Sequence, residues 1–403
     1  MDHFAQAPFP VTRRSVLIRA ARWSGGLAGI GLLTACAGSD IGTPVTQAPP
    51  AIEPVPAPAA QPLTSGPPVA LILPLSAQGN AAAVAQSLRN AAELALAETG
   101  QPAITLLVKD DGGTAQGARA AAQAAVSEGA RAILGPLFSH AVGPVGQVAR
   151  AQGIPVIAFS TDTNVAAAGV YLLSFLPQSD VERIIRFSAG QGRRSFIGLI
   201  PDNPYGMVAQ GAFQQAVSAT GGRVIVLERY TSDAARMATA VRNVAAVAAQ
   251  ADAIFIPDTA DATPQMVQQL VAAGLDLKKV RPLGTGLWDD PRLFARPQME
   301  GGQFAGAEAG GWRSFSDRYR ARYGADPLRM ATLSYDAVSL VSAIVRSRGV
   351  EGLNDVTLTN ASGFNGVDGI FRFRPDGTNE RGLAVMEIRN GAATVVSPAP
   401  RSF

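Results

Sequence analysis

The alternation of short apolar runs with longer alanine-rich stretches constrains the fold of this chain more than any other feature. The run from Val69 to Leu73 is apolar throughout, and the stretch from Asn80 to Glu98 that follows has apolar residues at helical spacing. Short apolar runs separated by helical stretches are typical of parallel strands buried on both faces of a sheet. The sequence therefore predicts an α/β fold in which β-α units stack around parallel sheets.

The alternation occurs in two series, which predicts two Rossmann-like lobes. In the first series we expect strands at 69–73, 104–108, 132–134 and 155–158 and helices at 80–98, 115–128 and 142–152. The second series begins near Tyr171, with strands at 196–200, 224–230, 253–257 and 281–283 and helices at 179–189, 205–219, 235–249 and 264–273. We also expect later helices at 315–323 and 330–348 and strands at 371–373 and 383–388, which need not belong to the second lobe.

The first 36 residues have the architecture of an export signal. A basic stretch from Thr12 to Leu17 precedes a 13-residue apolar run from Trp23 to Ala35. This run is shorter than the ~20 residues that a membrane-spanning helix needs, so a permanent transmembrane anchor is the less favoured alternative. The Arg13-Arg14 pair resembles a twin-arginine signal, although paired arginines also occur in ordinary leaders.

The only cysteine, Cys36, ends this leader in the sequence Leu33-Thr34-Ala35-Cys36. The segment resembles the lipobox of bacterial lipoproteins, which implies that Cys36 receives a lipid and becomes the first residue of the mature protein. Ala37, in place of Asp, is similar to the pattern that routes lipoproteins to the outer membrane of Gram-negative bacteria. The resemblance implies a periplasmic protein, anchored to a membrane through Cys36. Residues 37–68, rich in Pro and Ala, are expected to form a disordered spacer before a folded domain at 69–397.

Outside the leader the charges balance. Of the 34 basic and 31 acidic residues, four arginines and one aspartate precede Cys36, which leaves 30 of each. No run of Lys and Arg alternates with aromatic residues, so the sequence predicts no nucleic-acid partner.

Few residues of the folded part have side chains suited to catalysis or to metal binding. The chain has one Cys and two His, and His3 lies in the leader, which leaves His140. Neither Gly-x-Ser-x-Gly nor a P-loop occurs, and no zinc set of Cys and His can be assembled. The pairs Asp110-Asp111 and Asp289-Asp290 stand in turns, where adjacent carboxylates are more often solvated caps than catalytic pairs. We therefore expect a protein that is not an enzyme, with no catalytic residue, metal or cofactor.

A set of short motifs has the order and spacing of the leucine/isoleucine/valine-binding family of type I periplasmic binding proteins: Leu73-Pro74-Leu75-Ser76, Asp110-Asp111-Gly112, Leu134-Gly135-Pro136-Leu137, Pro155-Val156-Ile157, Pro204-Tyr205-Gly206 and Tyr335-Asp336-Ala337. The resemblance spans residues 69–390 and implies two lobes joined by a hinge of three crossings. These crossings are expected near Tyr171, Phe304 and Phe364. Lobe 1 would comprise residues 69–171 and 305–363, and lobe 2 would comprise residues 172–304 and 364–397.

The same resemblance implies a ligand site between the lobes, at the carboxyl ends of the strands. In the family, two loops hold an amino acid, and they match Ser139-His140-Ala141 and Ser160-Thr161-Asp162-Thr163 here. Asp258 and the segment 285–288 depart from the aromatic and acidic residues that amino-acid receptors often have. The residues implied as ligand-binding are Ser139, His140, Ser160, Thr161, Asp162, Thr163, Tyr205, Asp258, Thr285 and Trp288. The alternative for Ser139 and Ser160 is helix capping.

Two functions follow from the resemblance. In the first, the chain is the substrate-binding component of an ABC-type transport system, which binds an amino acid or similar small polar solute and meets an ABC permease. However, segments 158–162, 283–290 and 366–373 are similar to a lipoprotein branch of the superfamily, the penicillin-binding protein activators. In that branch the two-lobed domain binds and regulates a peptidoglycan synthase. A lipid tether with a long spacer suits both functions.

Overall fold

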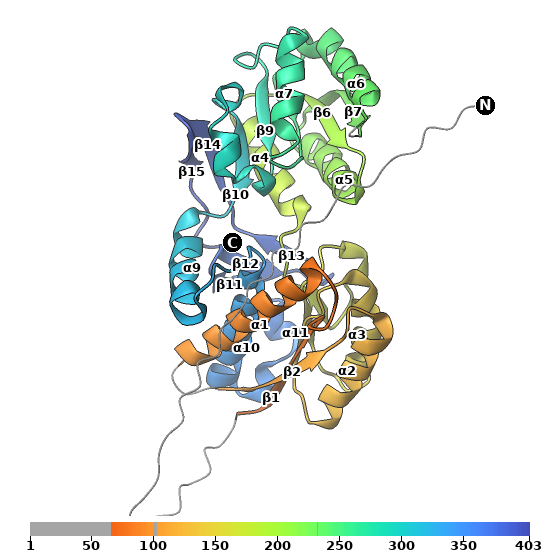
Figure 1. The fold of residues 1–403 in the computed structure, drawn as a ribbon, viewed down its shortest axis with the longest axis vertical. Helices are drawn as coiled ribbons and strands as arrows, with labels where there is room; N and C mark the ends of the chain where they lie inside the picture. Colours follow the sequence, from red (N-terminus) through yellow and green to blue (C-terminus); the bar gives the residue numbers. More distant parts are fainter. Residues whose placement is uncertain (1–65, 100–102, 232) are drawn as a thin grey trace, which may run out of the picture. The chain divides into compact units, whose positions relative to one another are not determined.

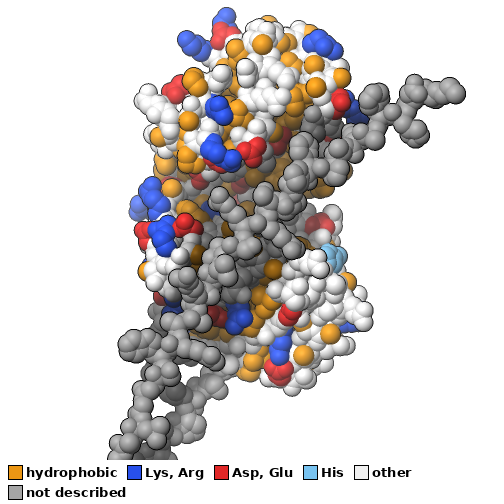
Figure 2. All heavy atoms as spheres, in the orientation of Figure 1, with side chains coloured by type: hydrophobic (Ala, Val, Ile, Leu, Met, Phe, Trp, Pro, Cys, Tyr) orange, Lys and Arg blue, Asp and Glu red, His pale blue; other side chains and the backbone are white. Residues whose placement is uncertain are grey.

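The computed structural model describes residues 66–99, 103–231 and 233–403, which lie in one compact unit, Pro62–Phe403. The predictions for the export signal, for Cys36 and for most of the spacer therefore lie outside the described residues. None of the helices in the described ranges combines the length and apolar character needed to cross a membrane. Acidic and basic side chains are interspersed on the face of the molecule that Figure 2 shows.

Lobe 1 is built on a five-stranded parallel sheet with the order β2-β1-β3-β4-β5. Its strands are β1 Pro68–Leu73, β2 Thr105–Asp110, β3 Ile133–Leu134, β4 Val156–Ala158 and β5 Val170–Leu172. The helices between them are α1 Asn80–Glu98, α2 Ala115–Ser127 and α3 Ser139–Arg150, with the 3-10 turn η1 at Thr163–Val165.

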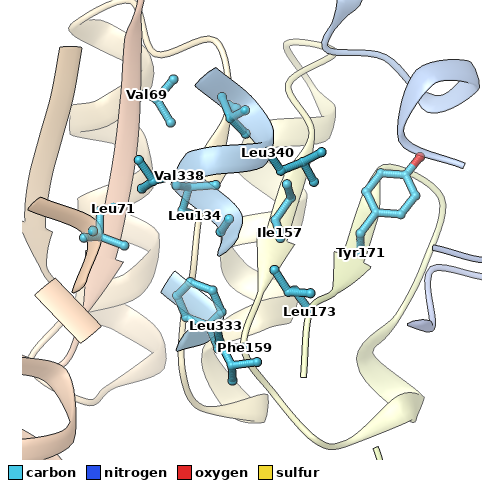
Figure 3. Close-up of a cluster of buried hydrophobic side chains, with 14 of the residues drawn as sticks. Val69, Leu71, Leu134, Ile157, Phe159, Tyr171, Leu173, Leu333, Val338 and Leu340 are labelled. Carbon is cyan, nitrogen blue, oxygen red and sulfur yellow. The ribbon is translucent and has the colours of Figure 1, made fainter. Parts of the chain in front are cut away.

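Strand β1 shows why this sheet is buried on both faces. Val69 and Leu71 point into a core cluster with α1 and α10 (Ala331–Arg348), whereas Ala70 and Ile72 point into a second cluster with α2 and α3. Successive side chains of a strand alternate between faces, so an unbroken apolar run serves two cores. Figure 3 shows the first cluster, in which side chains of the sheet meet Leu333, Val338 and Leu340 of α10.

Lobe 2 is built on a seven-stranded sheet with the order β15-β14-β10-β9-β8-β6-β7, in which β14 and β15 are antiparallel to their neighbours. Its strands are β6 Ser195–Pro201, β7 Arg223–Tyr230, β8 Ala253–Phe255, β9 Arg281–Gly284, β10 Gln303–Gly306, β14 Ala384–Arg389 and β15 Ala392–Ser397. The helices are α4 Pro177–Gly190, α5 Pro204–Ala219, α6 Ala234–Val247, α7 Thr263–Ala272 and α8 Pro291–Phe294, with 3-10 turns η2 Ala248–Gln250, η3 Gly286–Trp288 and η4 Pro297–Met299.

The chain then returns to lobe 1. Helix α10 lies beside α1, more than 200 positions earlier in the sequence (Figure 1). The returning elements are α9 Ala309–Tyr323, α10, the 3-10 turn η5 Val350–Gly352, α11 Asp355–Leu358 and a small antiparallel sheet of β11 Phe364–Gly366, β12 Gly369–Phe373 and β13 Asn379–Arg381.

The three crossings lie at 173–176, 307–308 and 382–383. The first two fall within a few residues of the predicted positions, but the third is a correction, because we expected it near Phe364. Strands β11 to β13 belong to lobe 1: the rings of Phe373 and Tyr171 are 5.2 Å apart, and Leu172 N donates a hydrogen bond of 2.8 Å to Gly377 O. An apolar strand pattern does not indicate which of two cores will bury it, so the sequence placed this boundary about 18 residues too early.

Trp288 is the largest fully buried side chain of lobe 2, and it packs directly on the backbone of Gly284. A Cβ at position 284 would overlap the indole ring. The absence of a side chain at Gly284 therefore makes room for Trp288 beneath strand β9.

We expect Gly284→Ala to lower the free energy of unfolding by about 1 to 3 kcal/mol, because the added methyl group must displace Trp288 in a packed core. The matched control is Gly211→Ala in α5, where an added Cβ meets no described atom within 4 Å. This control should raise stability by roughly 0.5 to 1 kcal/mol. Urea unfolding followed by circular dichroism measures both, and equal stabilities for the two variants would contradict the packing described for Trp288.

Candidate functional site

Four of the residues predicted to bind a ligand line one cavity of lobe 1. Ser139 lies at the start of α3, just after β3, and Ser160, Thr161 and Asp162 follow β4. They meet because the carboxyl ends of neighbouring parallel strands lie at the same edge of a sheet. The cavity has a volume of about 430 Å³ and is lined by Asn80, Ala81, Val84, Leu137, Phe138, Ser139, Phe159, Ser160, Thr161, Asp162 and Met330.

Some polar groups of this cavity already form hydrogen bonds within the protein, and others do not. Ser160 is buried, and its Oγ accepts a hydrogen bond of 3.1 Å from Asp162 N. Asp162 Oδ1 accepts bonds from the backbone N and the side-chain Nδ2 of Asn164, at 3.0 and 2.9 Å. Within the described ranges, the hydroxyls of Ser139 and Thr161 make no hydrogen bond. These two hydroxyls are therefore available to a ligand.

The structure does not give Ser139 or Ser160 the helix-capping role that was the alternative. The N-cap of α3 is Phe138, and Ser139 is the first helical residue. The Oγ of Ser160 stabilises the turn before η1, whose N-cap is Asp162.

His140 and Thr163 do not line the cavity. The His140 ring stacks on Phe138 with 5.5 Å between ring centroids, and its Nε2 lies 3.0 Å from Gly113 O. Thr163 lies within η1. Of these two, His140 supports the cavity indirectly, by holding the Phe138 side chain.

The predicted residues of lobe 2 form two tyrosine-centred pairs. Tyr205 donates a hydrogen bond of 2.9 Å to Thr285 Oγ1, and Tyr230 donates one of 2.5 Å to Asp258 Oδ2. Burial raises the pKa of both tyrosines well above the usual value, so both hydroxyls remain protonated donors. Thr285 is fully buried, and its Oγ1 accepts the hydrogen bond from Tyr205.

Trp288 requires a correction. We expected it at the ligand site, but it has no exposed surface and lies in the hydrophobic core of lobe 2. The expectation came from the family resemblance, which places residues 285–288 at the ligand site. The space beneath Gly284, which only the fold reveals, places its ring in the core instead.

A group of charged residues at the hinge was missed by sequence reasoning. We call Asp180, Arg329, Asp336, Asp368 and Arg381 the hinge cluster. Asp368, 1% exposed, accepts hydrogen bonds from Arg329 Nη1 and Nη2 at 3.0 and 2.6 Å. Asp336 and Asp368 stand in segments that the family resemblance had marked, whereas no sequence motif marked Arg381.

Both arginines of the cluster are stacked between aromatic rings. The order is Trp312, Arg329, Phe175, Arg381 and Phe371, with successive distances from guanidinium carbon to ring centroid of 4.8, 4.7, 4.7 and 5.6 Å. We call this arrangement the hinge stack. Phe175 lies in the first crossing, Arg381 ends β13 just before the third, and Trp312 lies in α9 just after the second.

Arg381 is the most deeply placed charge of the stack, at 5% exposure. Its Nε donates a hydrogen bond of 3.0 Å to Ser174 O. Nη1 and Nη2 are buried and have no hydrogen-bond partner within the part of the chain that the structure describes. Charges on Asp336, Asp368 and Asp180 lie near enough to influence it.

Two carboxyl groups of the hinge cluster titrate near neutral pH. Burial raises the pKa of Asp336 to about 7, although nearby Arg381 and a hydrogen bond from Val367 N act in the opposite direction. Burial likewise raises the pKa of Asp180 to about 7, against a hydrogen bond of 2.9 Å from Gly286 N. The charge of the hinge cluster therefore depends on pH in the physiological range.

We expect the stability of the protein to fall, relative to Asp336→Asn, as the pH rises from about 4 to about 7, and this difference to level off above about pH 8. The folded protein holds the Asp336 proton more tightly than the unfolded chain, so this contribution is complete below about pH 4 and is lost as the pH rises through about 7. The difference in slope should approach about 1.4 kcal/mol per pH unit. Urea unfolding across this range provides the measurement, with exposed Asp317→Asn as control. Parallel curves for wild type and Asp336→Asn would show that this carboxyl does not titrate there.

Comparison with known proteins identifies the family. A sequence profile of the periplasmic binding protein family matches residues 68–393, so the chain belongs to this family. The prediction of a type I periplasmic binding protein fold with parallel-sheet lobes is confirmed. Membership implies a periplasmic location. Binding rather than catalysis is what the family is known for, and no group of three acidic, His or Cys residues that could hold a metal occurs in the described ranges.

Several solved structures have this fold. A candidate branched-chain amino acid ABC transporter protein from Rhodospirillum rubrum has a TM-score of 0.73 at 22% identity, covering 82% of this chain and 100% of that chain. A substrate-binding protein from Desulfitobacterium hafniense, in complex with Leu, has a TM-score of 0.60 at 19% identity, covering 82% and 100%. A solute-binding protein from R. palustris, in complex with benzoate, has a TM-score of 0.58 at 18% identity, covering 84% and 98%.

Among curated proteins, an uncharacterized protein of Rickettsia prowazekii, RP748, is 25% identical over 134 residues. The match covers 33% of this chain and 36% of the relative, so the chain matches about a third of that protein's length.

Proposed function

We propose that the chain is a lipid-anchored periplasmic receptor that binds an amino acid or similar small polar solute between its lobes, as the substrate-binding component of an ABC-type transport system. The observation that carries this proposal is the cavity lined by Ser139, Ser160, Thr161 and Asp162. The structural relatives bound to Leu and to benzoate support it, because both ligands have a carboxylate next to an apolar group.

The cavity combines groups that suit such a ligand. Ser139 stands in the first turn of α3, where backbone N–H groups and a free hydroxyl favour a carboxylate. Asp162 Oδ2 makes no hydrogen bond among the described residues and could accept one from an ammonium group. Val84, Leu137, Phe138, Phe159 and Met330 supply an apolar wall. The ligand class we favour is therefore an amino acid or another small carboxylate with an apolar side chain.

Thr161→Val is expected to weaken solute binding about 3- to 10-fold, because it removes one free hydroxyl from the cavity while preserving the shape of the side chain. The matched control is Thr163→Val, two residues further on and outside the cavity lining. Calorimetry against a panel of amino acids and aromatic carboxylates, on protein stripped of bound ligand, measures the affinities. No binding across the panel would overturn the proposal. Equal weakening by both variants would show that the solute does not bind in this cavity.

The second candidate function is that of a penicillin-binding protein activator. One observation favours it: of the three activator-like segments, 158–162 lines the cavity, but 283–290 and 366–373 do not. Instead Gly286 N donates to Asp180, and Asp368 holds Arg329. Two of the three activator-like segments thus contribute residues to the hinge rather than to the cavity. This function would be supported over the first if the immobilised protein retains a bifunctional penicillin-binding protein and binds no solute of the panel.

Either function includes the lipid anchor. Cys36→Ser should leave the protein in the soluble fraction, because several acyl chains, each contributing about 0.8 kcal/mol per buried CH₂, are then absent. Fractionation with mass spectrometry of the wild-type N-terminus provides the measurement, and separating inner from outer membranes tests the expected outer-membrane location. An unmodified Cys36 in membrane-bound protein would contradict the lipobox interpretation.

A further inference from the structure

The segment that follows β15 runs along the crossings rather than away from the fold. Arg183 of α4 donates hydrogen bonds from Nη2 to Ser397 Oγ at 2.7 Å and to Pro398 O at 3.4 Å. Ala399 N then donates a bond of 3.0 Å to Glu308 Oε1, at the second crossing. Residues that follow lobe 2's last strand are thus fixed both to the helix after the first crossing and to the second crossing itself.

The same segment continues across the third crossing onto lobe 1. Pro400 lies so close to Gly382 that a Cβ at position 382 would be 3.0 Å from its ring. The Phe403 ring lies under the Arg372 guanidinium, with 4.4 Å from the guanidinium carbon to the ring centroid. Phe403 also faces Gly363, where a Cβ would be 3.0 Å from the ring. Arg372 and Gly363 belong to lobe 1, so the segment links the two lobes.

We propose that residues 398–403 form a strap that fastens the hinge from outside and limits the movement of the lobes relative to each other. The strap begins on lobe 2, contacts the second and third crossings, and ends with the Phe403 side chain seated on lobe 1. Hinge motion requires these crossings to change their backbone angles, and a segment attached on both sides opposes that change. This proposal does not depend on which ligand or partner the lobes bind.

The contacts of the strap indicate that its end on lobe 1 can be detached. A cavity of about 300 Å³ lies beneath it, lined by residues of α4, of the third crossing and of the strap itself, including Arg183, Gly382, Pro398, Pro400 and Phe403. The strap is therefore not packed over its whole length, and a few contacts hold it. Phe403 is the single aromatic anchor among them, so its removal should free the lobe 1 end of the strap.

The test compares Phe403→Ala with Val395→Ala, a matched apolar truncation on β15 at a side chain that is 45% exposed. The full-length chain would carry Cys36→Ser, with nitroxide labels at Ser127→Cys in lobe 1 and Lys279→Cys in lobe 2. Electron–electron double resonance on the ligand-free protein measures the distribution of interlobe distances. Hydrogen exchange measures the opening of residues 307–308 and 382–383.

We expect Phe403→Ala to broaden the distance distribution and to raise exchange at both crossings at least about threefold, the effect of losing one cation–π contact. Val395→Ala should leave both readouts at wild-type values. A chain that ends at Ser397 provides a second, stronger variant. Wild-type distances and exchange in folded Phe403→Ala and in this shortened chain would overturn the proposal, whatever the solute panel shows.

Discussion

The stacking of two arginines between three aromatic rings is the interaction on which the two-lobed arrangement depends. Each crossing is a short segment, and the hinge stack joins residues from or next to all three. Guanidinium groups suit this position because they are planar and weakly hydrated, so their faces can pack against rings while their edges still donate hydrogen bonds. Arg329 donates hydrogen bonds to Asp368, and Arg381 Nε donates one to the backbone of the first crossing.

The hinge and the cavity meet at two consecutive residues. Arg329 belongs to the hinge stack, and Met330 lines the cavity of lobe 1. Because a ligand can shift a conformational equilibrium only by contacting the two states differently, this adjacency matters for either candidate function. A molecule that packs against Met330 acts next to the guanidinium that organises the crossings.

The sequence predicted local elements well and long-range pairs poorly. Helix α1 was predicted with the observed bounds, because its apolar spacing is regular. Strands β5, β10, β11, β13 and β15 were not predicted; Gln303–Gly306, for example, is short and ends in glycine, and Asn379–Arg381 is polar. The cavity loops were implied by the family resemblance, which placed them at the ligand site. The hinge cluster was not, since Arg329 and Asp368 are 39 residues apart and Arg381 and Ser174 are 207 apart.

The discontinuity of lobe 1 has a consequence for the nascent chain. One face of strand β1 is covered by α10, which begins 258 positions after β1 ends. At a synthesis rate of about 5 to 20 residues per second, the ribosome needs roughly 13 to 50 seconds to supply that cover. During this interval α10 is not yet present to cover the side chains of Val69 and Leu71. Lobe 1 therefore remains without a complete core for most of translation, a state compatible with threading the chain unfolded through a translocase.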